Sequence, residues 1–285
     1  MSAGNSSSAA SWNKRVNAVT IVGVGLIGGS FALALRKAEF AGRIIGVSSP
    51  ETIRCALDRG AIDEALPLAQ AAAQSDLIYL ARPIAGILET LGVIDAHVRP
   101  GTLITDAGST KLAITQRAAA HIRRGRFVGG HPMAGKESRG VAAAEAELFR
   151  DRPYVLTSPD AELQSWIERM GARVVILGAE EHDRLVALTS HLPQLISTAL
   201  AASIGSQPGA EQVAGPAATD LTRLALSPYD IWRDIFATNS APIDAALGAF
   251  IGKLEELRGM LRSPEIERAF ERAAEAARSL REPKY

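Results

Sequence analysis

A glycine pattern near the start of the chain could bind a phosphate group. Segment 19–28 reads VTIVGVGLIG, an apolar run of β-strand composition that ends in Gly23-x-Gly25-x-x-Gly28, and a helix-like segment follows at 29–36. A strand, a glycine turn and a helix N-terminus together present free backbone N–H groups to a pyrophosphate, so this order predicts a dinucleotide site. The alternative is a glycine-rich turn in another kind of α/β protein. The residues expected at the ligand are Gly23, Gly25, Leu26, Ile27 and Gly28.

The end of the next predicted strand bears on which dinucleotide is used. That strand covers 43–47, and Ser48 and Ser49 follow it where NAD sites usually carry an acid for the ribose 2′-hydroxyl. Hydroxyl groups can bond a 2′-phosphate without repelling it, and Arg54 is close in sequence. The pattern leans toward NADP and leaves NAD or dual use open. Alternatively, the two serines only cap the helix that is predicted from residue 51.

Strand-like and helix-like segments alternate along the first 178 residues. This alternation is typical of an α/β fold, and with the glycine turn it predicts a Rossmann-like, mostly parallel sheet with helices on both faces. Ligands of such sheets bind at the carboxyl ends of the strands. Those ends are expected at Gly23, Ser48, Ala81, Asp106 and Gly130. Further strands are expected at 43–47, 75–81, 101–106, 127–130, 154–157 and 173–177, and helices at 51–59, 86–97, 111–123 and 161–170.

The chain changes character after Gly178. Segments 180–204, 227–261 and 264–281 are helix-like, and Ser263-Pro264 marks the start of the last one. We expect a disordered tail over 1–16, a dinucleotide-binding domain over 17–178 and an all-α domain over 179–285. A small helical domain with apolar faces is expected to pack against a second copy of the chain, which predicts a homodimer through this domain.

Composition and charge argue against several classes of partner and site. Lysine and arginine together number 31, as do aspartate and glutamate, so no basic excess recommends nucleic acid or an anionic membrane. Cys55 is the one cysteine, which rules out an intramolecular disulfide or a cysteine-built metal site and suits the reducing cytoplasm. No stretch predicts a confident membrane span, and the start of the chain lacks a secretory-signal pattern. We therefore expect a cytoplasmic protein that binds small molecules and no metal.

Five further motifs carry residues suited to catalysis and anion binding. They are 106–111 (DAGSTK), 127–137 (FVGGHPMAGKE), 190–194 (SHLPQ), 219–223 (TDLTR) and 231–236 (IWRDIF). With these motifs, in this order, the sequence resembles the prephenate and arogenate dehydrogenases of tyrosine biosynthesis from about residue 19 to residue 261. In that family a dinucleotide-binding domain is followed by a helical dimerisation domain.

The resemblance implies oxidative decarboxylation of a cyclohexadienol. Hydride leaves ring carbon C4 for the nicotinamide, the C4 hydroxyl loses its proton, and the ring carboxylate departs as CO2. His131 matches the family's catalytic histidine, and a neutral imidazole is suited to accept the proton at pH 7. Ser109 matches the family serine that orients substrate, histidine and nicotinamide. Without its motif, His131 would be interpreted as a loop histidine with a structural hydrogen bond.

The resemblance also implies contacts for the substrate's carboxylates. Arg223 matches the family's carboxylate-binding arginine, and guanidinium suits that role; a surface ion pair with Asp220 is the alternative. His191 matches a second substrate-contacting histidine, and Pro193 would bend the helix and aim it into the cleft between the domains. The alternative for His191 is a buried histidine bonded to backbone.

Two acidic residues favour arogenate over prephenate as the substrate. Arogenate carries an ammonium group where prephenate carries a keto group, and an ammonium group favours a nearby carboxylate. Glu137 is expected at the mouth of the pocket, and Asp151 aligns with a family position where an acid accompanies arogenate preference. Asp151 could equally be a surface charge neutralised by Arg150 and Arg152.

Some residues depart from the family pattern or match none of it. Arg82 stands where many relatives carry a small residue before Pro83, and we assign both residues to the cofactor side, although Arg82 could instead point to solvent. Trp232 is expected in the core rather than in the site. The histidines that match no motif, and are expected at the surface, are His97, His121 and His182.

Two other functions stay open from the sequence. A β-hydroxyacid dehydrogenase or imine reductase also joins a dinucleotide-binding domain to a helical dimerisation domain, but it usually depends on a lysine in that second domain. Lys253 and Lys284 are the lysines there, and neither lies in a convincing motif. A dinucleotide-sensing protein would keep the glycine turn without needing the other motifs.

Overall fold

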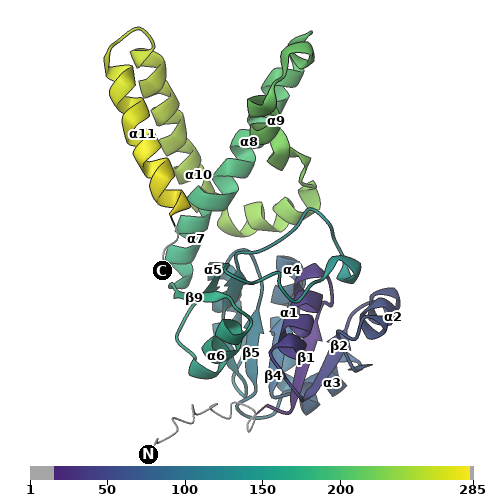
Figure 1. Cartoon of the computed structure of the whole chain (residues 1–285). Helices are drawn as coiled ribbons and strands as arrows, with labels where there is room; N and C mark the ends of the chain where they lie inside the picture. The colour runs from purple at the N-terminus through teal and green to yellow at the C-terminus, as the bar shows by residue number, and fades with distance from the viewer. Residues whose placement is uncertain (1–15, 283–285) are drawn as a thin grey trace, which may run out of the picture.

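A computed structural model describes residues 16–282, which begin with a parallel sheet (Figure 1). The order of its six strands is β3-β2-β1-β4-β5-β6, so the chain crosses from one side of β1 to the other between β3 and β4. This confirms the Rossmann-like α/β fold. The strands are β1 (Ala18–Val22), β2 (Arg43–Val47), β3 (Glu64–Ala65), β4 (Leu77–Leu80), β5 (Leu103–Asp106) and β6 (Arg126–Val128).

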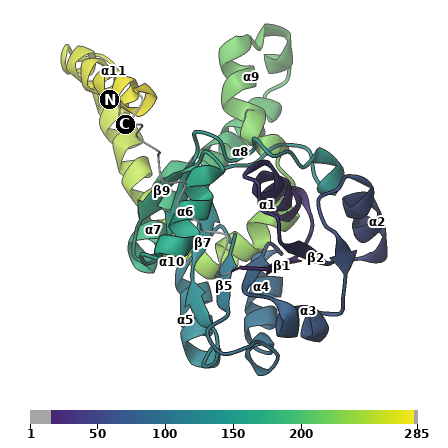
Figure 2. The same cartoon turned by 60° about the horizontal axis from the view of Figure 1, so that its bottom comes forward.

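Helices cover both faces of the sheet, as Figure 2 shows with α1 on one side of the strands and α3, α4 and α5 on the other. On the α1 face, Phe31 stacks on Tyr79 with ring centroids 3.8 Å apart. On the opposite face, Ile87 of α4 and Ile114 of α5 are fully buried. The helices are α1 (Leu26–Lys37), α2 (Pro50–Asp58), α3 (Leu68–Gln74), α4 (Ile84–Leu91) and α5 (Leu112–His121).

The glycine turn joins β1 to α1 at the carboxyl end of the sheet. Gly23 has a φ of +94°, and a Cβ atom there would lie 2.5 Å from the carbonyl oxygen of Ala81. A Cβ atom on Gly28 would lie 2.1 Å from the carbonyl oxygen of Gly23. A Cβ atom on Gly25, which precedes the first residue of α1, would meet no heavy atom within 4 Å. The turn is therefore closely packed on its inner side and open at Gly25.

A second, smaller sheet corrects the expected pattern of strands. The expected strand 127–130 is split, because the chain leaves β6 at Gly129 and enters β7, which pairs with β8 and not with the large sheet. The Gly129 amide donates to the side-chain hydroxyl of Thr157, the Thr157 amide donates to the carbonyl of Gly129, and the Gly130 amide donates to the carboxylate of Asp106 at 3.0 Å. These bonds turn the strand aside. The sheet contains β7 (Gly130–Pro132), β8 (Pro153–Leu156) and β9 (Arg173–Ile176). In the sequence, α6 (Ala161–Arg169) connects the last two strands.

The last part of the chain is helical and forms two diverging arms, which Figure 1 shows projecting away from the sheet. One arm holds α8 and α9, and the other holds the hairpin of α10 and α11. The expected helix 180–204 contains a π-helical turn at Ala187–His191, and α10 is kinked at Asn239, three residues before Pro242. The helices are α7 (Ala179–Val186), α8 (Leu192–Gly205), α9 (Pro216–Thr222), α10 (Tyr229–Met260) and α11 (Glu265–Arg281).

One helical stretch, Ala179–Gly205, is long and apolar enough to cross a membrane by length and composition alone. It carries the buried side chains of His182, Asp183 and Gln194, and each of these bonds to other groups of the protein. We therefore interpret the stretch as part of the folded helical domain rather than a membrane span.

The expected tail meets the described part of the chain only at its last residue. Residues 1–15 lie outside the described range, and Val16 is packed in the core.

Candidate active site

A cavity of about 1020 Å³ opens between the sheet domain and the helical part. It brings together four residues that the sequence analysis singled out, namely Ser109, His131, Glu137 and Arg223. They come from three segments: Ser109 follows β5, His131 and Glu137 belong to β7 and the loop after it, and the 3-10 turn at Arg223–Leu226 supplies Arg223. Other residues that line the cavity include Met133, Lys136, Arg139, Ser190, Gln194, Trp232 and Ile235.

A buried ion pair fixes the strand that carries His131. Asp106 at the end of β5 and Lys111 at the start of α5 are both fully buried and bond to each other. Asp106 also accepts from the amides of Gly108 and Gly130 at 2.8 and 3.0 Å, and Lys111 donates to the Gly130 carbonyl at 2.7 Å. Each charge therefore has several partners, which a buried ion pair needs to offset its lost hydration. Gly130 precedes His131, so this pair holds the histidine's backbone from two sides.

His131 bonds to a second histidine that the sequence analysis expected at the surface. His131 Nδ1 lies 2.8 Å from Nε2 of His182, and Nδ1 of His182 lies 2.7 Å from the carboxylate of Asp183. His182 is fully buried, so the surface expectation was wrong. The two histidines are 51 residues apart, and they meet only because α7 packs behind β7; no local pattern could show it.

The surroundings of His131 favour its neutral form. Burial is the largest cause that lowers the pKa of its imidazole well below the ordinary value, and His182, Lys111 and His191 lower that pKa further. A neutral imidazole has one nitrogen with a free lone pair. His131 can therefore accept a proton at neutral pH, which a permanently charged ring could not do.

Ion pairs join the loop after β7 to the helical part at the rim of the cavity. Arg223 lies 3.2 Å from the carboxylate of Glu137, with side chains 60% and 83% exposed. Arg223 thus pairs with Glu137 and not with Asp220, the partner that the sequence analysis considered. Arg139 binds Asp230 through two hydrogen bonds of 2.9 and 3.0 Å. Exposed pairs of this kind contribute little to stability, so a competing anion can displace them.

His191 lies behind the wall of the cavity and not on it. It is almost fully buried, its Nδ1 lies 3.2 Å from the side-chain nitrogen of Asn239, and its ring meets the edge of Trp232. Burial lowers the pKa of His191 to about 4. The bend of the helix at Pro193 does not aim this ring into the cavity, and the polar atom that it bonds belongs to Asn239 rather than to the backbone.

Trp232 and Gln194 line the cavity, although the sequence analysis placed one in the core and did not single out the other. Trp232 donates from Nε1 to the hydroxyl of Ser227 at 2.9 Å. Gln194 is buried and donates from Nε2 to the carbonyl of Leu224 at 2.8 Å. Gln194 lies three residues after His191, one helical turn along the same helix. This spacing could have indicated from the sequence that Gln194 lies near the site.

Asp151 lies apart from this cavity. It is exposed, has a φ of +59°, and donates its amide to the carbonyl of Gly171 at the turn before β8. It is not among the described residues that line the cavity, so within one chain the structure brings together the other acid, Glu137, but not Asp151.

The dinucleotide side of the sheet fits the expected ligand at the turn. The amides of Leu26, Ile27 and Gly28 form the first turn of α1, where backbone N–H groups lack partners inside the helix. No side chain caps this end of the helix. Together with the open space at Gly25, this leaves the site that a pyrophosphate needs.

The remaining cofactor candidates are engaged in local contacts. Ser49 accepts from the amide of Thr52 at 3.4 Å and caps α2, so the alternative interpretation holds for this serine, while Ser48 takes no part in that cap. Arg82 donates to the carbonyl of Gly86 and the hydroxyl of Thr90 along α4, and its stem lies beside Gly23. The residue before α4 is Pro83, which begins the helix without a side-chain cap.

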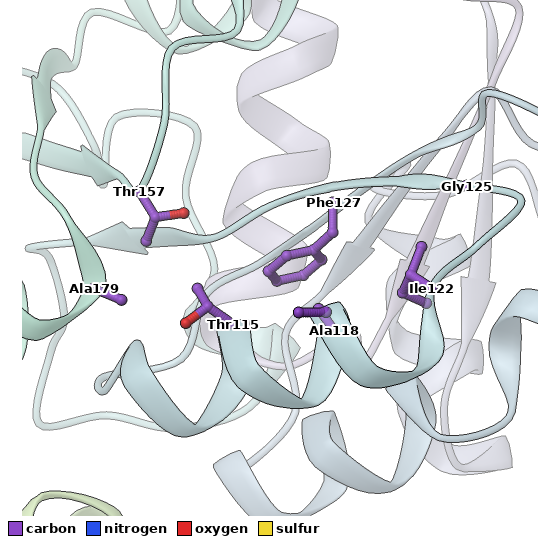
Figure 3. A pocket seen from close by; sticks show the side chains of 8 residues that line it. Thr115, Ala118, Ile122, Gly125, Phe127, Thr157 and Ala179 are labelled. Atoms are coloured by element: carbon purple, nitrogen blue, oxygen red, sulfur yellow. The ribbon is translucent and has the colours of Figure 1, made fainter.

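A separate hollow of about 420 Å³ lies between α5, β6 and the start of α7 (Figure 3). The side chains that line it are uncharged, with Ile122 toward one end, Phe127 in the middle and the hydroxyl groups of Thr115 and Thr157 nearer the other end. It contains none of the residues that the motifs singled out as catalytic, so we do not assign the active site to it.

Comparison with known families finds two matching models that cover most of the chain. Residues 31–180 match the nucleotide-binding domain of prephenate dehydrogenase, and residues 178–275 match the prephenate dehydrogenase dimerization domain.

Individual relatives agree with these models. A prephenate dehydrogenase of Lactococcus lactis is 36% identical over 228 residues, which are 78% of this chain and 64% of that protein. The crystal structure of a Synechocystis arogenate dehydrogenase aligns with a TM-score of 0.82 at 30% identity over 92% of this chain and 99% of that one. A prephenate dehydrogenase from Aquifex aeolicus, solved with hydroxyphenyl propionate and NAD+, aligns with a TM-score of 0.86 at 29% identity over 93% and 98%.

Proposed function

Because the chain belongs to the prephenate dehydrogenase family, we propose that it oxidatively decarboxylates prephenate or arogenate and passes hydride to a nicotinamide dinucleotide. The observation that carries this proposal is the position of His131. Its ring lines a cavity between the two parts of the chain, in surroundings that keep it neutral, and Ser109 and Arg223 line the same cavity. A proton acceptor and a carboxylate-binding group are the two side chains that this reaction needs from the protein.

The roles of the residues follow from the order of bond changes. His131 accepts the proton of the C4 hydroxyl, which leaves electron density on the oxygen that helps to expel hydride from C4. When bound, the nicotinamide supplies the acceptor for that hydride. The ring carboxylate then leaves as CO2, and the ring becomes aromatic. Ser109 orients the hydroxyl beside His131, and Arg223 holds a substrate carboxylate so that C4 stays in place.

Arogenate is the substrate that we favour, and the reason is the pair of Glu137 and Arg223. The side chain of arogenate ends in an amino acid group, which carries both a carboxylate and an ammonium group. It can therefore bind both Arg223 and Glu137 and replace this exposed ion pair. A keto acid would take Arg223 and leave the Glu137 carboxylate beside a second anion. The position of Asp151 outside the cavity removes it from this argument, so the preference depends on Glu137 alone.

For the cofactor we favour NADP slightly over NAD. The tip of β2 carries Ser48 and Ser49 and no carboxylate, so nothing there repels a 2′-phosphate. Because the hydroxyl of Ser49 is engaged in capping α2, Ser48 and the nearby Arg54 are the groups available to a 2′-phosphate.

We further propose that the protein acts as a homodimer in the cytoplasm. Large apolar side chains stand exposed on both arms of the helical part, among them Val213, Leu254 and Phe270, at 85%, 50% and 70% exposure. Such exposure is typical of a surface that a partner covers. The single, partly buried cysteine suits a reducing compartment.

Steady-state kinetics with prephenate and arogenate, each with NAD+ and NADP+, test these proposals together. We expect reduced nicotinamide with a cyclohexadienol and the highest kcat/KM with arogenate and NADP+. A higher kcat/KM with prephenate would overturn the substrate preference. No reduced cofactor with either compound would overturn the function and favour a dinucleotide sensor or a β-hydroxyacid dehydrogenase.

A further inference from the structure

We propose that His182 and Asp183 form a positioning pair that fixes which nitrogen of His131 carries the proton, so that Nε2 of His131 presents its lone pair to the substrate hydroxyl. This inference rests on the proposed function for the identity of the substrate. The arrangement of protons follows from the hydrogen bonds alone, because the partner of one ring nitrogen decides the state of the other.

The carboxylate of Asp183 can accept hydrogen bonds but cannot donate them. Its two oxygens lie at the start of α5 and accept the amides of Lys111 and Leu112 at 2.7 and 2.9 Å. This is the position where a negative charge is favoured by a helix N-terminus. The oxygen that binds the Lys111 amide also lies 2.7 Å from Nδ1 of His182. Because a carboxylate cannot donate, Nδ1 of His182 carries a hydrogen.

The position of the hydrogen on His182 in turn determines the position of the hydrogen on His131. In the neutral ring of His182, a hydrogen on Nδ1 leaves a lone pair on Nε2. That Nε2 atom lies 2.8 Å from Nδ1 of His131, so Nδ1 of His131 must carry the hydrogen of this bond. Nε2 of His131 is then the unprotonated nitrogen. This is the atom that can take a proton in the cavity.

The opposite arrangement needs one more proton on the two histidines, and therefore a net positive charge behind the cavity. It requires a doubly protonated His182 that donates to His131 and leaves the hydrogen of His131 on Nε2, where it could not accept from a hydroxyl. The Asp183 carboxylate would favour that charge, but it already accepts the amides of Lys111 and Leu112, and the buried ammonium of Lys111, which bonds to Asp106, opposes further positive charge nearby. His191, on the other side, bonds to Asn239.

The backbone of the pair is held in place independently of the catalytic ring. The side chain of Asn239 donates to the carbonyl of Asp183 at 2.9 Å and joins α10 to α7. His182 is fully buried and Asp183 nearly so, which keeps water from competing for the two bonds. When His131 accepts the substrate's proton, the bond to His182 stabilises the new positive charge, since Asp183 lies behind it.

Nitrogen-15 NMR of histidine-labelled protein tests the assignment directly. In the wild type we expect His131 to carry its hydrogen on Nδ1. In His182→Leu we expect the hydrogen to move mainly to Nε2, the form that a free imidazole favours. His182→Gln keeps an oxygen that can accept from Nδ1 of His131, so it should retain the wild-type form. His97→Leu, which changes an exposed histidine, is the matched control.

Kinetics give the second readout. We expect kcat of His182→Leu to fall by roughly tenfold to a thousandfold with KM changed less than about threefold, and His182→Gln to recover a large part of the loss. A wild-type His131 with its hydrogen on Nε2 overturns the proposal without any variant, and so does an unchanged form in His182→Leu. Because NMR needs no turnover, this test stands apart from the proposed function, whose failure would appear as wild-type protein that turns over neither cyclohexadienol.

Discussion

His131 depends on residues that never reach the cavity. Asp106 and Lys111 hold its backbone through Gly130, and His182 bonds its ring from behind. All three of these side chains are fully buried. A single imidazole in a loop would titrate near its ordinary pKa and turn freely, whereas this one is neutral and oriented.

The lowered pKa of His131 predicts that its imidazole stays able to accept a proton at mildly acidic pH. The imidazole must be neutral to accept a proton, and burial with neighbouring positive groups moves its pKa well below the ordinary value. The pH profile of kcat/KM should therefore stay flat as pH falls through about 6.5, the ordinary pKa of histidine, and decline only at lower pH. An acid limb with its midpoint at or above that value would contradict the prediction.

At the scale of single residues, the sequence predicted the groups that line the cavity better than the buried residues that hold them in place. The motif around His131 and the arginine of the 219–223 motif were sufficient to predict residues that now line one cavity. His182 was missed because its contact with His131 spans 51 residues and two elements. The substrate contact of His191 stays a prediction: its ring lies in the packing behind the cavity, and Gln194, one helical turn later, is the residue that lines the cavity.

At the scale of elements, the turn from β1 to α1 is the part that sequence describes most completely. Its glycine spacing is a local pattern, although the contacts that require Gly23 and Gly28 are made both within the turn, to the carbonyl of Gly23, and outside it, to the carbonyl of Ala81. By contrast, the departure of β7 from the large sheet depends on Asp106 and Thr157, which lie far along the chain. Strand composition alone could not show it.

Alanine substitutions at two glycines of the turn should have different effects: one should lower the stability of the protein and the other its affinity for nucleotide. Gly28→Ala would place Cβ 2.1 Å from a backbone oxygen, so the protein should lose about 1–3 kcal/mol or more of unfolding free energy. Gly25→Ala meets nothing within 4 Å and should stay within about 1 kcal/mol of the wild type. Its methyl group points into the space for the pyrophosphate, so nucleotide affinity should fall at least about tenfold. Thermal unfolding and nucleotide titration measure the two effects; a Gly25→Ala protein with unchanged affinity would place the ligand elsewhere.

On the scale of the whole molecule, the helical part leaves more apolar surface exposed than a monomer needs. The hairpin of α10 and α11 diverges from α8 and α9, and both arms carry exposed large apolar residues (Figure 1). The sequence indicated helices with apolar faces, but the divergence of the arms is a tertiary property that periodicity does not contain.

This exposure predicts that charge on the hairpin breaks the dimer. Leu254→Glu combined with Phe270→Glu would bury two carboxylates in an apolar contact, which is costly without partners. Light scattering at micromolar concentration should show a dimer for the wild type and a monomer for the double variant. Glu255→Lys, which exchanges one exposed charge on the same helix for another, should remain dimeric. A wild-type protein that is monomeric at every concentration would rule out this use of the surface.

The central claim is that the imidazole of His131 removes the hydroxyl proton as hydride leaves C4. It is tested most directly by the turnover of His131→Ala with saturating cyclohexadienol and cofactor. The account predicts a kcat roughly two to four orders of magnitude below that of the wild type, with cofactor affinity unchanged. A variant that turns over at a near-normal rate would contradict it.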